Sequence, residues 1–152
     1  MQSHSDLNPA EFAVIFPIFF LALWCGIILL IGQIGGWAVL ARRFRLTLPF
    51  AGQSWGWQSA RMRWSCNYGG CLRVGADPTG LYLATFFLFR AGHPPLLVPW
   101  PEVTVSRRKV LFFTYVELRL GREEQIPFVI NQKLAERVRG AAGASWPVEP
   151  VS

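Results

Sequence analysis

The sequence has few of the side chains that hold metals or carry out catalysis. Among 152 residues there are two histidines and three cysteines, and neither histidine lies near Cys66 or Cys71 in the sequence. A zinc site needs several such ligands close together, and GxSxG, P-loop and HExxH motifs are missing as well. The remaining candidates are His93, in an expected loop, and the pair Glu123 and Glu124, in an expected turn. We therefore expect no metal, no cofactor, no small-molecule substrate and no enzymatic activity.

Charge is absent from one long stretch of the chain. No Asp, Glu, Lys or Arg occurs between Phe12 and Ala41, in a chain that is 52% hydrophobic. A bilayer core of about 30 Å needs roughly 20 apolar residues in a helix. The sequence therefore predicts one transmembrane helix over 12–41, with its helical core at Phe12–Leu40, after a short extension over 1–11. A cleaved signal peptide is disfavoured because no Lys or Arg precedes the stretch, and because the stretch is too long.

Basic residues are absent before this stretch and abundant after it. All 15 Lys and Arg follow residue 41, together with seven Asp and Glu, which gives that part a formal charge of +8. The first three basic residues are Arg42, Arg43 and Arg45. The positive-inside rule then predicts an inner (cytoplasmic) membrane protein with its N-terminus outside and its C-terminal domain in the cytoplasm. In a reducing cytoplasm we expect free thiols at Cys66 and Cys71, and a disulfide across the turn between them is the alternative.

The expected transmembrane helix carries a small-residue motif. Gly32 and Gly36 have GxxxG spacing, and Gln33 lies beside them. Glycines allow helices to approach closely, and a glutamine can hydrogen-bond across such a contact. We therefore expect this face to pack against another integral membrane protein. Trp37, next to the arginines, suits a position at the membrane interface.

After a linker over 42–56, the hydrophobic period changes to two. Ala60, Met62 and Trp64 alternate with polar residues, as in a half-buried strand. Further strands are expected over 71–76, 81–89, 96–98, 102–106, 110–120 and 125–130. Only after Asn131, a plausible N-cap, does the period become helical. The pattern predicts a small antiparallel barrel or sandwich of about six to seven strands over 57–142, closed by a C-terminal capping helix, with a Pro-rich tail over 143–152.

Four prolines surround a single tryptophan in "HPPLLVPWPEV" (93–103). Proline lacks an amide donor, so it is confined to edges, bulges and turns in a sheet. We expect Pro94 and Pro95 to end a hairpin loop, and Pro99 and Pro101 to bend the chain around Trp100. Trp64 and Trp100 are both predicted to be buried in the domain core.

Two segments, "GGCLRVGADPTGLYLA" (69–84) and "PPLLVPWPEVTV" (94–105), carry a resemblance to a known fold. In this order, with the terminal helix after them, they resemble the pleckstrin-homology (PH) superfold, and in particular the bacterial PH-like domains found beside transmembrane helices. The resemblance covers about Trp57–Ala142. Phosphoinositide-binding members tend to have a basic cluster in the first hairpin loop, whereas "SCNYGGC" (65–71) here has no Lys or Arg. Specific headgroup recognition is therefore not expected.

These observations favour a non-enzymatic interaction or scaffold protein, an accessory subunit of a larger membrane complex. A respiratory or photosynthetic complex is one host, although nothing in the sequence selects it. The alternative is a module that binds anionic lipid headgroups while its own helix anchors it. A second basic cluster is Arg107, Arg108 and Lys109, which we expect to join Arg42, Arg43 and Arg45 in a band facing the membrane or an acidic partner. Self-association into a homo-oligomer is a third option, and nucleic-acid binding is not expected.

Overall fold

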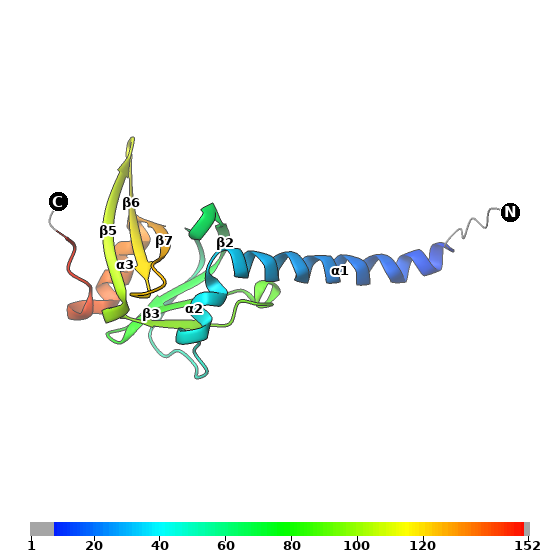
Figure 1. The fold of residues 1–152 in the computed structure, drawn as a ribbon, viewed down its shortest axis with the longest axis horizontal. Coiled ribbons are helices and arrows are strands. Elements are labelled where there is room, and N and C mark those ends of the chain that lie inside the picture. Colours follow the sequence, from blue (N-terminus) through cyan, green and yellow to red (C-terminus); the bar gives the residue numbers. More distant parts are fainter. Residues whose placement is uncertain (1–7, 151–152) are drawn as a thin grey trace.

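A long N-terminal helix leads into a curled antiparallel sheet and a final helix in the computed structural model, which describes residues 8–150 (Figure 1). The helices are α1 (Pro9–Ile34), α2 (Trp37–Phe44) and α3 (Gln132–Ala142), with short 3-10 turns η1 (Arg63–Ser65), η2 (Phe87–Phe89), η3 (Trp100–Glu102) and η4 (Gly143–Ser145). The strands are β1 (Gln53–Arg61), β2 (Asn67–Ala76), β3 (Gly80–Thr85), β4 (Leu96–Pro99), β5 (Val103–Val110), β6 (Phe113–Leu120) and β7 (Ile126–Asn131). This confirms the predicted class, a single apolar helix followed by a mainly-β domain with a C-terminal helix.

α1 is a candidate membrane span. Asn8 and Glu11 form a capping box at its start, and Pro9 occupies the first helical turn, where its missing amide costs nothing. Nearly all of its large apolar side chains are exposed, as expected for a helix that faces lipid rather than a protein core. Within residues 8–150 it is the one helix that is long and apolar enough to cross a bilayer. Of the predicted extension over 1–11, residues 1–7 lie outside the described part of the chain.

The predicted helix over 12–41 is in fact two helices. α1 stops at Ile34, and Gly36, with φ of +91°, turns the chain into α2. Only glycine adopts this backbone region readily. Trp37 does not lie at a membrane interface as expected, because it is fully buried, and its indole N–H donates to the Pro94 carbonyl at 2.9 Å. The glycine break thus directs α2 into the β domain, where Leu40 and Phe44 join the core.

The expected linker over 42–56 is shorter than predicted and is attached to the domain. Residues 42–44 belong to α2, and Arg45 forms a bridge to Leu96. Phe50 stacks on Tyr82 with ring centroids 4.3 Å apart. β1 then begins at Gln53, four residues before the predicted start of the domain.

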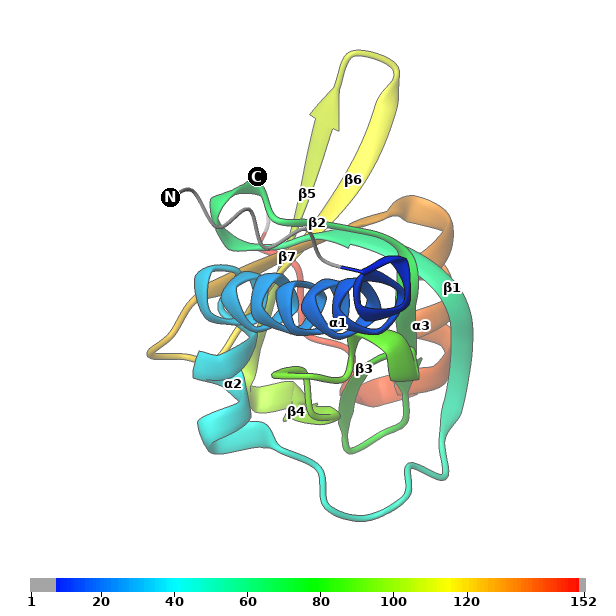
Figure 2. The same cartoon turned by 90° about the vertical axis from the view of Figure 1, so that its right-hand side faces the viewer.

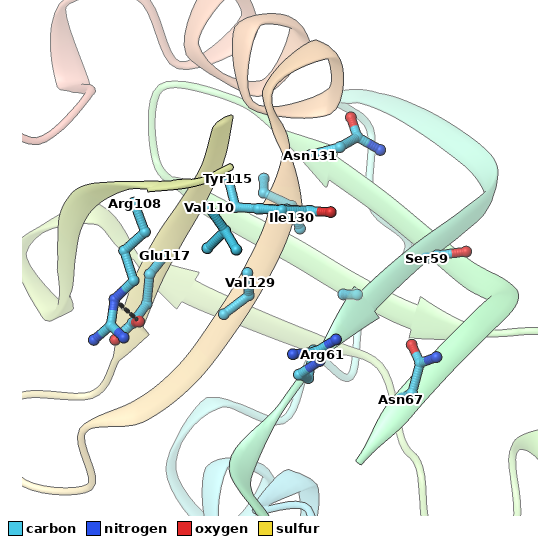
Figure 3. Close-up of a pocket in the computed structure, with 11 residues that line it drawn as sticks. Ser59, Arg61, Asn67, Arg108, Val110, Tyr115, Glu117, Val129, Ile130 and Asn131 are labelled. Carbon is cyan, nitrogen blue, oxygen red and sulfur yellow. Dashed lines mark ion pairs between the residues drawn. The ribbon is translucent and has the colours of Figure 1, made fainter. Parts of the chain in front are cut away.

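The seven strands form one sheet in the order β4-β3-β2-β1-β7-β6-β5. The two outermost strands, β4 and β5, are consecutive in the chain and are joined only by the three residues of η3. The sheet must therefore curl until its edges approach, which gives a half-barrel (Figure 2). At its middle, β1 and β7 pair at a single position, Arg61 with Val129, and then diverge (Figure 3).

Trp100 lies at the turn where β4 leads to β5. It is 4% exposed, and its indole N–H donates to the Asp77 carbonyl at 2.7 Å. Pro99 and Pro101 flank it at positions where no ladder donor is needed. The expected role of this proline-rich stretch as a bend around a buried tryptophan agrees with the structure.

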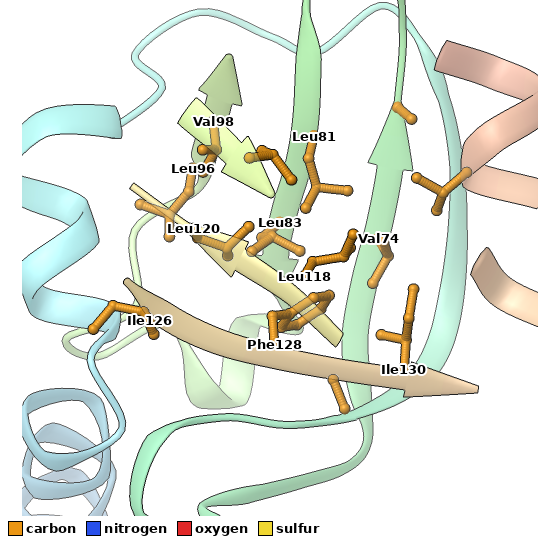
Figure 4. Packing of buried hydrophobic residues seen from close by; sticks show 14 of the residues in the cluster. Val74, Leu81, Leu83, Leu96, Val98, Leu118, Leu120, Ile126, Phe128 and Ile130 are labelled. Carbon is orange, nitrogen blue, oxygen red and sulfur yellow. The ribbon is translucent and has the colours of Figure 1, made fainter. Parts of the chain in front are cut away.

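The concave side of the sheet holds the core (Figure 4). Alternate residues of β2, Leu72, Val74 and Ala76, point inward, which agrees with the period of two expected for the strand over 71–76. α3 covers the open end with Leu134, Ala135, Val138 and Ala142. Asn131 caps it as predicted, because its side chain accepts the Leu134 amide hydrogen at 2.8 Å.

Two further local predictions, on Trp64 and on the strand over 81–89, were wrong. Trp64 is 78% exposed rather than buried, because β1 ends at Arg61 and the left-handed backbone of η1 turns the Trp64 side chain outward. The strand expected over 81–89 ends at Thr85, and η2 follows. The described part of the Pro-rich tail contacts the domain, since Trp146 packs on Trp100 and Glu149 pairs with Arg107 at 2.8 Å; residues 151–152 lie outside the described part.

Candidate functional site

The β5–β6 hairpin projects from the half-barrel and ends in an apolar tip (Figures 1 and 2). Leu111 and Phe112 form the turn between Val110 and Phe113, and they are 81% and 94% exposed. Two-residue hairpin turns favour Asn-Gly or Asp-Gly pairs. Here the first turn residue is a leucine with φ of +54°. Apolar residues in a strained, exposed turn contradict local preference, and such exceptions gather at functional positions.

The base of this hairpin is held by a buried carboxylate. Glu117 is 4% exposed and pairs with Arg108 at 2.7 Å and with Arg119 at 3.0 Å. Buried charges need such partners. On the other strand of the hairpin, Arg107 pairs with Glu149 of the tail. The predicted contact residues Arg107 and Arg108 are therefore partly occupied inside the chain, whereas Lys109, next to the tip, makes no ion pair within residues 8–150.

A groove of about 430 Å³ opens where β1 and β7 diverge (Figure 3). Its lining comes from β1, β2, β5, β6 and β7 and includes Arg61, Asn67, Arg108, Tyr115 and Glu117. Asn131 also borders it, but its side-chain oxygen caps α3. The lining combines apolar side chains with the charged groups of Arg61, Arg108 and Glu117. Through Arg108 and Glu117 it continues into the base of the hairpin.

A buried polar pair within the β domain, His93 and Tyr68, lies against the C-terminal end of α1. His93 lies in a loop as expected, between η2 and β4, but it is only 2% exposed. Its Nδ1–H donates to the Ala91 carbonyl at 3.0 Å, which leaves Nε2 to accept the Tyr68 hydroxyl at 3.0 Å. Burial lowers the pKa of His93 below its ordinary 6.5, despite the opposing effect of nearby carbonyls. Burial raises the pKa of Tyr68, with a smaller contribution from Cys66 and Cys71. Both groups are thus held neutral.

The glycines of the predicted helix-packing motif lie against the chain's own domain. A Cβ on Gly32 would meet His93 at 3.0 Å, and one on Gly36 would meet Ile126 at 2.9 Å. Because α1 ends at Ile34, the two glycines do not even share a helix. Gln33 is exposed. The close approach that glycine permits is therefore used within the chain, and Gln33 is the member of the motif still open to a neighbour.

The two basic clusters do not form the predicted band. α2 carries Arg42 and Arg43 at the opposite side of the domain from the hairpin tip (Figures 1 and 2). Arg43 pairs with Glu124 at 3.0 Å and with Glu102 at 3.4 Å, and the hydrogen bond to Glu124 raises its pKa. Within residues 8–150, Arg42 and Arg45 make no ion pair, so these two remain available at the C-terminal end of α2.

Cysteine and metal chemistry are not prominent at these sites. Cys25, Cys66 and Cys71 are free thiols, and burial raises the pKa of Cys71. Among residues 8–150, no three His, Cys, Asp or Glu side chains gather as metal ligands.

Sequence reasoning missed the hairpin tip because it assigned 110–120 to one strand. A signal was present: four consecutive apolar residues, Val110–Phe113, break the alternation directly after the basic cluster. In this chain the run covers the end of β5, the two-residue turn and the start of β6, rather than the interior of one strand.

No protein-family model matches this chain. No curated protein and no solved structure matches it either.

Proposed function

We propose that this chain is a non-enzymatic, membrane-anchored interaction protein, an accessory subunit that docks onto a larger membrane assembly through its β5–β6 hairpin. The single observation that carries the proposal is the projecting tip, with Phe112 94% exposed. Contiguous exposed apolar patches mark interaction sites, and aromatic side chains are frequent anchors in interfaces. Lys109 at the rim would favour an acidic edge on the partner.

The direction of the hairpin favours a protein partner over the bilayer. It lies beyond the C-terminal end of α1 and projects sideways from the helix axis rather than along it (Figure 1). If α1 crosses the membrane, the tip is held away from the lipid and reaches across the surface toward neighbouring proteins. The positive-inside rule supports a cytoplasmic position for the domain, at the inner membrane, through Arg42, Arg43 and Arg45.

The fold assignment that we propose is a bacterial PH-like domain. It is supported by a four-stranded meander, β1 to β4, followed by a three-stranded meander, β5 to β7, and a C-terminal helix over the open end. This agrees with the order implied by the sequence resemblance. PH-like modules serve as binding platforms, which is consistent with an accessory role.

The test is co-purification after mild solubilisation from native membranes. The wild-type chain should migrate with a larger complex, and Phe112→Asp should release it, because a charge at the centre of the contact would have to be desolvated. Val148→Asp is the matched control, since Val148 is as exposed as Phe112 but lies in the tail. A wild-type chain that migrates as a free monomer, or a Phe112→Asp chain that stays bound, contradicts the proposal.

The alternative, binding to anionic lipid, is favoured by the formal charge of +8 after residue 41. It is best tested on the full chain, since a domain cut at residue 55 would lose the core residues Trp37, Leu40 and Phe44. A fluorophore at Phe112→Cys should then shift its emission to the blue in vesicles with anionic lipid and return on addition of salt. Emission that is the same in anionic and zwitterionic vesicles speaks against this alternative.

A further inference from the structure

A second apolar segment lies beside α1, separate from the hairpin. The η2 turn and the residue before it read Phe86-Phe87-Leu88-Phe89. Phe87 is 76% and Leu88 58% exposed. Trp24 of α1 touches this turn, because its indole N–H donates to the Leu88 carbonyl at 3.3 Å and its ring lies 5.6 Å from that of Phe89. The turn therefore sits alongside the C-terminal half of α1 (Figure 1).

The length of α1 indicates how deep in the bilayer the contact between Trp24 and η2 would lie. The part of α1 before Trp24, Pro9–Leu23, has 15 residues, which at about 1.5 Å per residue is about 22 Å. A bilayer core is about 30 Å thick and needs about 20 residues. Counted from Phe12, the first residue after the charged Glu11, 20 residues end at Ile31. Trp24 then lies about 10 Å inside the hydrocarbon, and η2 lies at the same depth.

The turn has the surface that such a depth requires. Its four successive side chains are apolar, and the first charged residue after them is the exposed Arg90. Trp57, also exposed, packs on Phe86 with ring centroids 4.5 Å apart. An irregularity in the β1–β2 register lies at Trp57, which has φ of +56°. Such bulges re-aim side chains, and this one adds Trp57 to the apolar surface.

Several backbone groups of the turn are also satisfied within the protein. The Phe86 amide donates to the Cys71 carbonyl at 3.1 Å, and the Phe89 amide donates to the Phe86 carbonyl at 2.9 Å. The Leu88 carbonyl accepts Trp24. Backbone at membrane depth requires such partners.

We infer that the segment Phe86–Phe89, with Trp57, inserts into the acyl-chain region of the bilayer beside α1 as a second, monotopic membrane contact. The occupant of this apolar surface is lipid hydrocarbon, since the surface is continuous with the lipid-facing side of α1. The inference rests on α1 spanning the membrane, as the proposed function also assumes. The side chain of Arg90, which directly follows Phe89, would then extend toward the headgroups and keep its guanidinium in contact with water.

The test uses the full chain in zwitterionic phosphatidylcholine vesicles at high lipid-to-protein ratio. The three native cysteines are replaced by alanine, and a single cysteine at Leu88, Leu21 or Phe112 carries an environment-sensitive fluorophore. Leu21 reports the anchor, and Phe112 is an exposed apolar control outside the proposed contact. We expect the labels at Leu21 and Leu88 to be shifted to the blue and quenched by nitroxides on the lipid acyl chains, while the label at Phe112 remains water-like.

The outcomes separate the two ideas. A water-like label at Leu88 with a quenched label at Leu21 overturns the insertion while the anchor stands. A label at Leu88 that is blue-shifted but insensitive to the lipid nitroxides shows that protein covers the turn, which also overturns it. A label at Leu21 that is not quenched removes the anchor and the inference together. Unchanged melting of the labelled Leu88→Cys chain in detergent checks that the substitution leaves the fold intact.

Discussion

Trp64 and Trp100 show how much a tryptophan's role depends on its place in the chain. Both end or interrupt an alternating segment, yet Trp100 fills the corner of the half-barrel while Trp64 faces outward. Burying a large aromatic side chain and satisfying its indole N–H stabilises a core. Removing the Trp100 side chain should therefore lower the free energy of unfolding more than removing that of Trp64.

We expect Trp100→Ala to lower the free energy of unfolding by about 3 kcal/mol or more, because it leaves a cavity and orphans the Asp77 carbonyl. The matched variant Trp64→Ala should change it by no more than about 0.5 kcal/mol, as for other exposed positions. Denaturant unfolding in mild detergent, followed by circular dichroism, measures both. Equal destabilisation by the two variants would contradict the burial of Trp100.

For single residues, the sequence predicted the direction of side chains in regular strands, where hydrophobic periodicity decides it, and little else. Leu72, Val74 and Ala76 follow a regular strand, so their inward direction could be read directly. Trp64 could not, because the alternation continued in the sequence after the strand had ended. The burial of His93 had no local signal, since it depends on α1 packing from a distant part of the chain.

At the scale of elements, the break between α1 and α2 is the feature that sequence composition concealed. The apolar stretch is continuous through Gly35 and Gly36, so it read as a single span. What ends α1 is the left-handed conformation at Gly36 together with the space occupied by Ile126. Neither can be seen without the tertiary partner. The overall order of strands followed by a helix, by contrast, depends on local periods and turns, and it was predictable.

Gly36→Ala should lower the free energy of unfolding by about 1 to 2 kcal/mol from the backbone conformation alone, with a further loss from the contact with Ile126. Gly26→Ala is the control on α1, because a Cβ there meets nothing within 4 Å. Alanine favours helix over glycine by about 1 kcal/mol, so Gly26→Ala should match or exceed the wild type. Thermal melting of the full chain in one detergent compares the two, and a Gly36→Ala chain as stable as Gly26→Ala would refute the argument.

For the whole molecule, the joint between α1 and the β domain is buried and titratable. Tyr68, Trp37 and Gly32 surround His93, and Arg45 and Arg90 line the adjoining hollow. Because the folded chain keeps His93 neutral, its pKa is lower when folded than when unfolded. The free energy of unfolding is therefore not reduced by His93 above pH 6.5. It falls as the pH drops below 6.5, because protonation of His93 then favours the unfolded chain.

We expect the unfolding free energy of the wild type to decline as the pH falls below about 6.5, and this component to be absent from His93→Gln. The measurement is a series of denaturation curves across pH in one detergent. A His93→Gln profile parallel to that of the wild type would show that His93 does not titrate against folding.

Contacts between α1, α2 and the β domain hold the helix and the domain in one relative orientation. Arg63 donates to the Ile34 carbonyl at 3.2 Å, and Trp37 is locked in the core immediately after the two-residue break. α1 and the β domain therefore have one fixed orientation relative to each other in this structure. If α1 spans a membrane, as proposed, the hairpin tip has a defined height above the bilayer and a defined direction around the α1 axis. A partner on the tip would then be held at a set distance from the membrane.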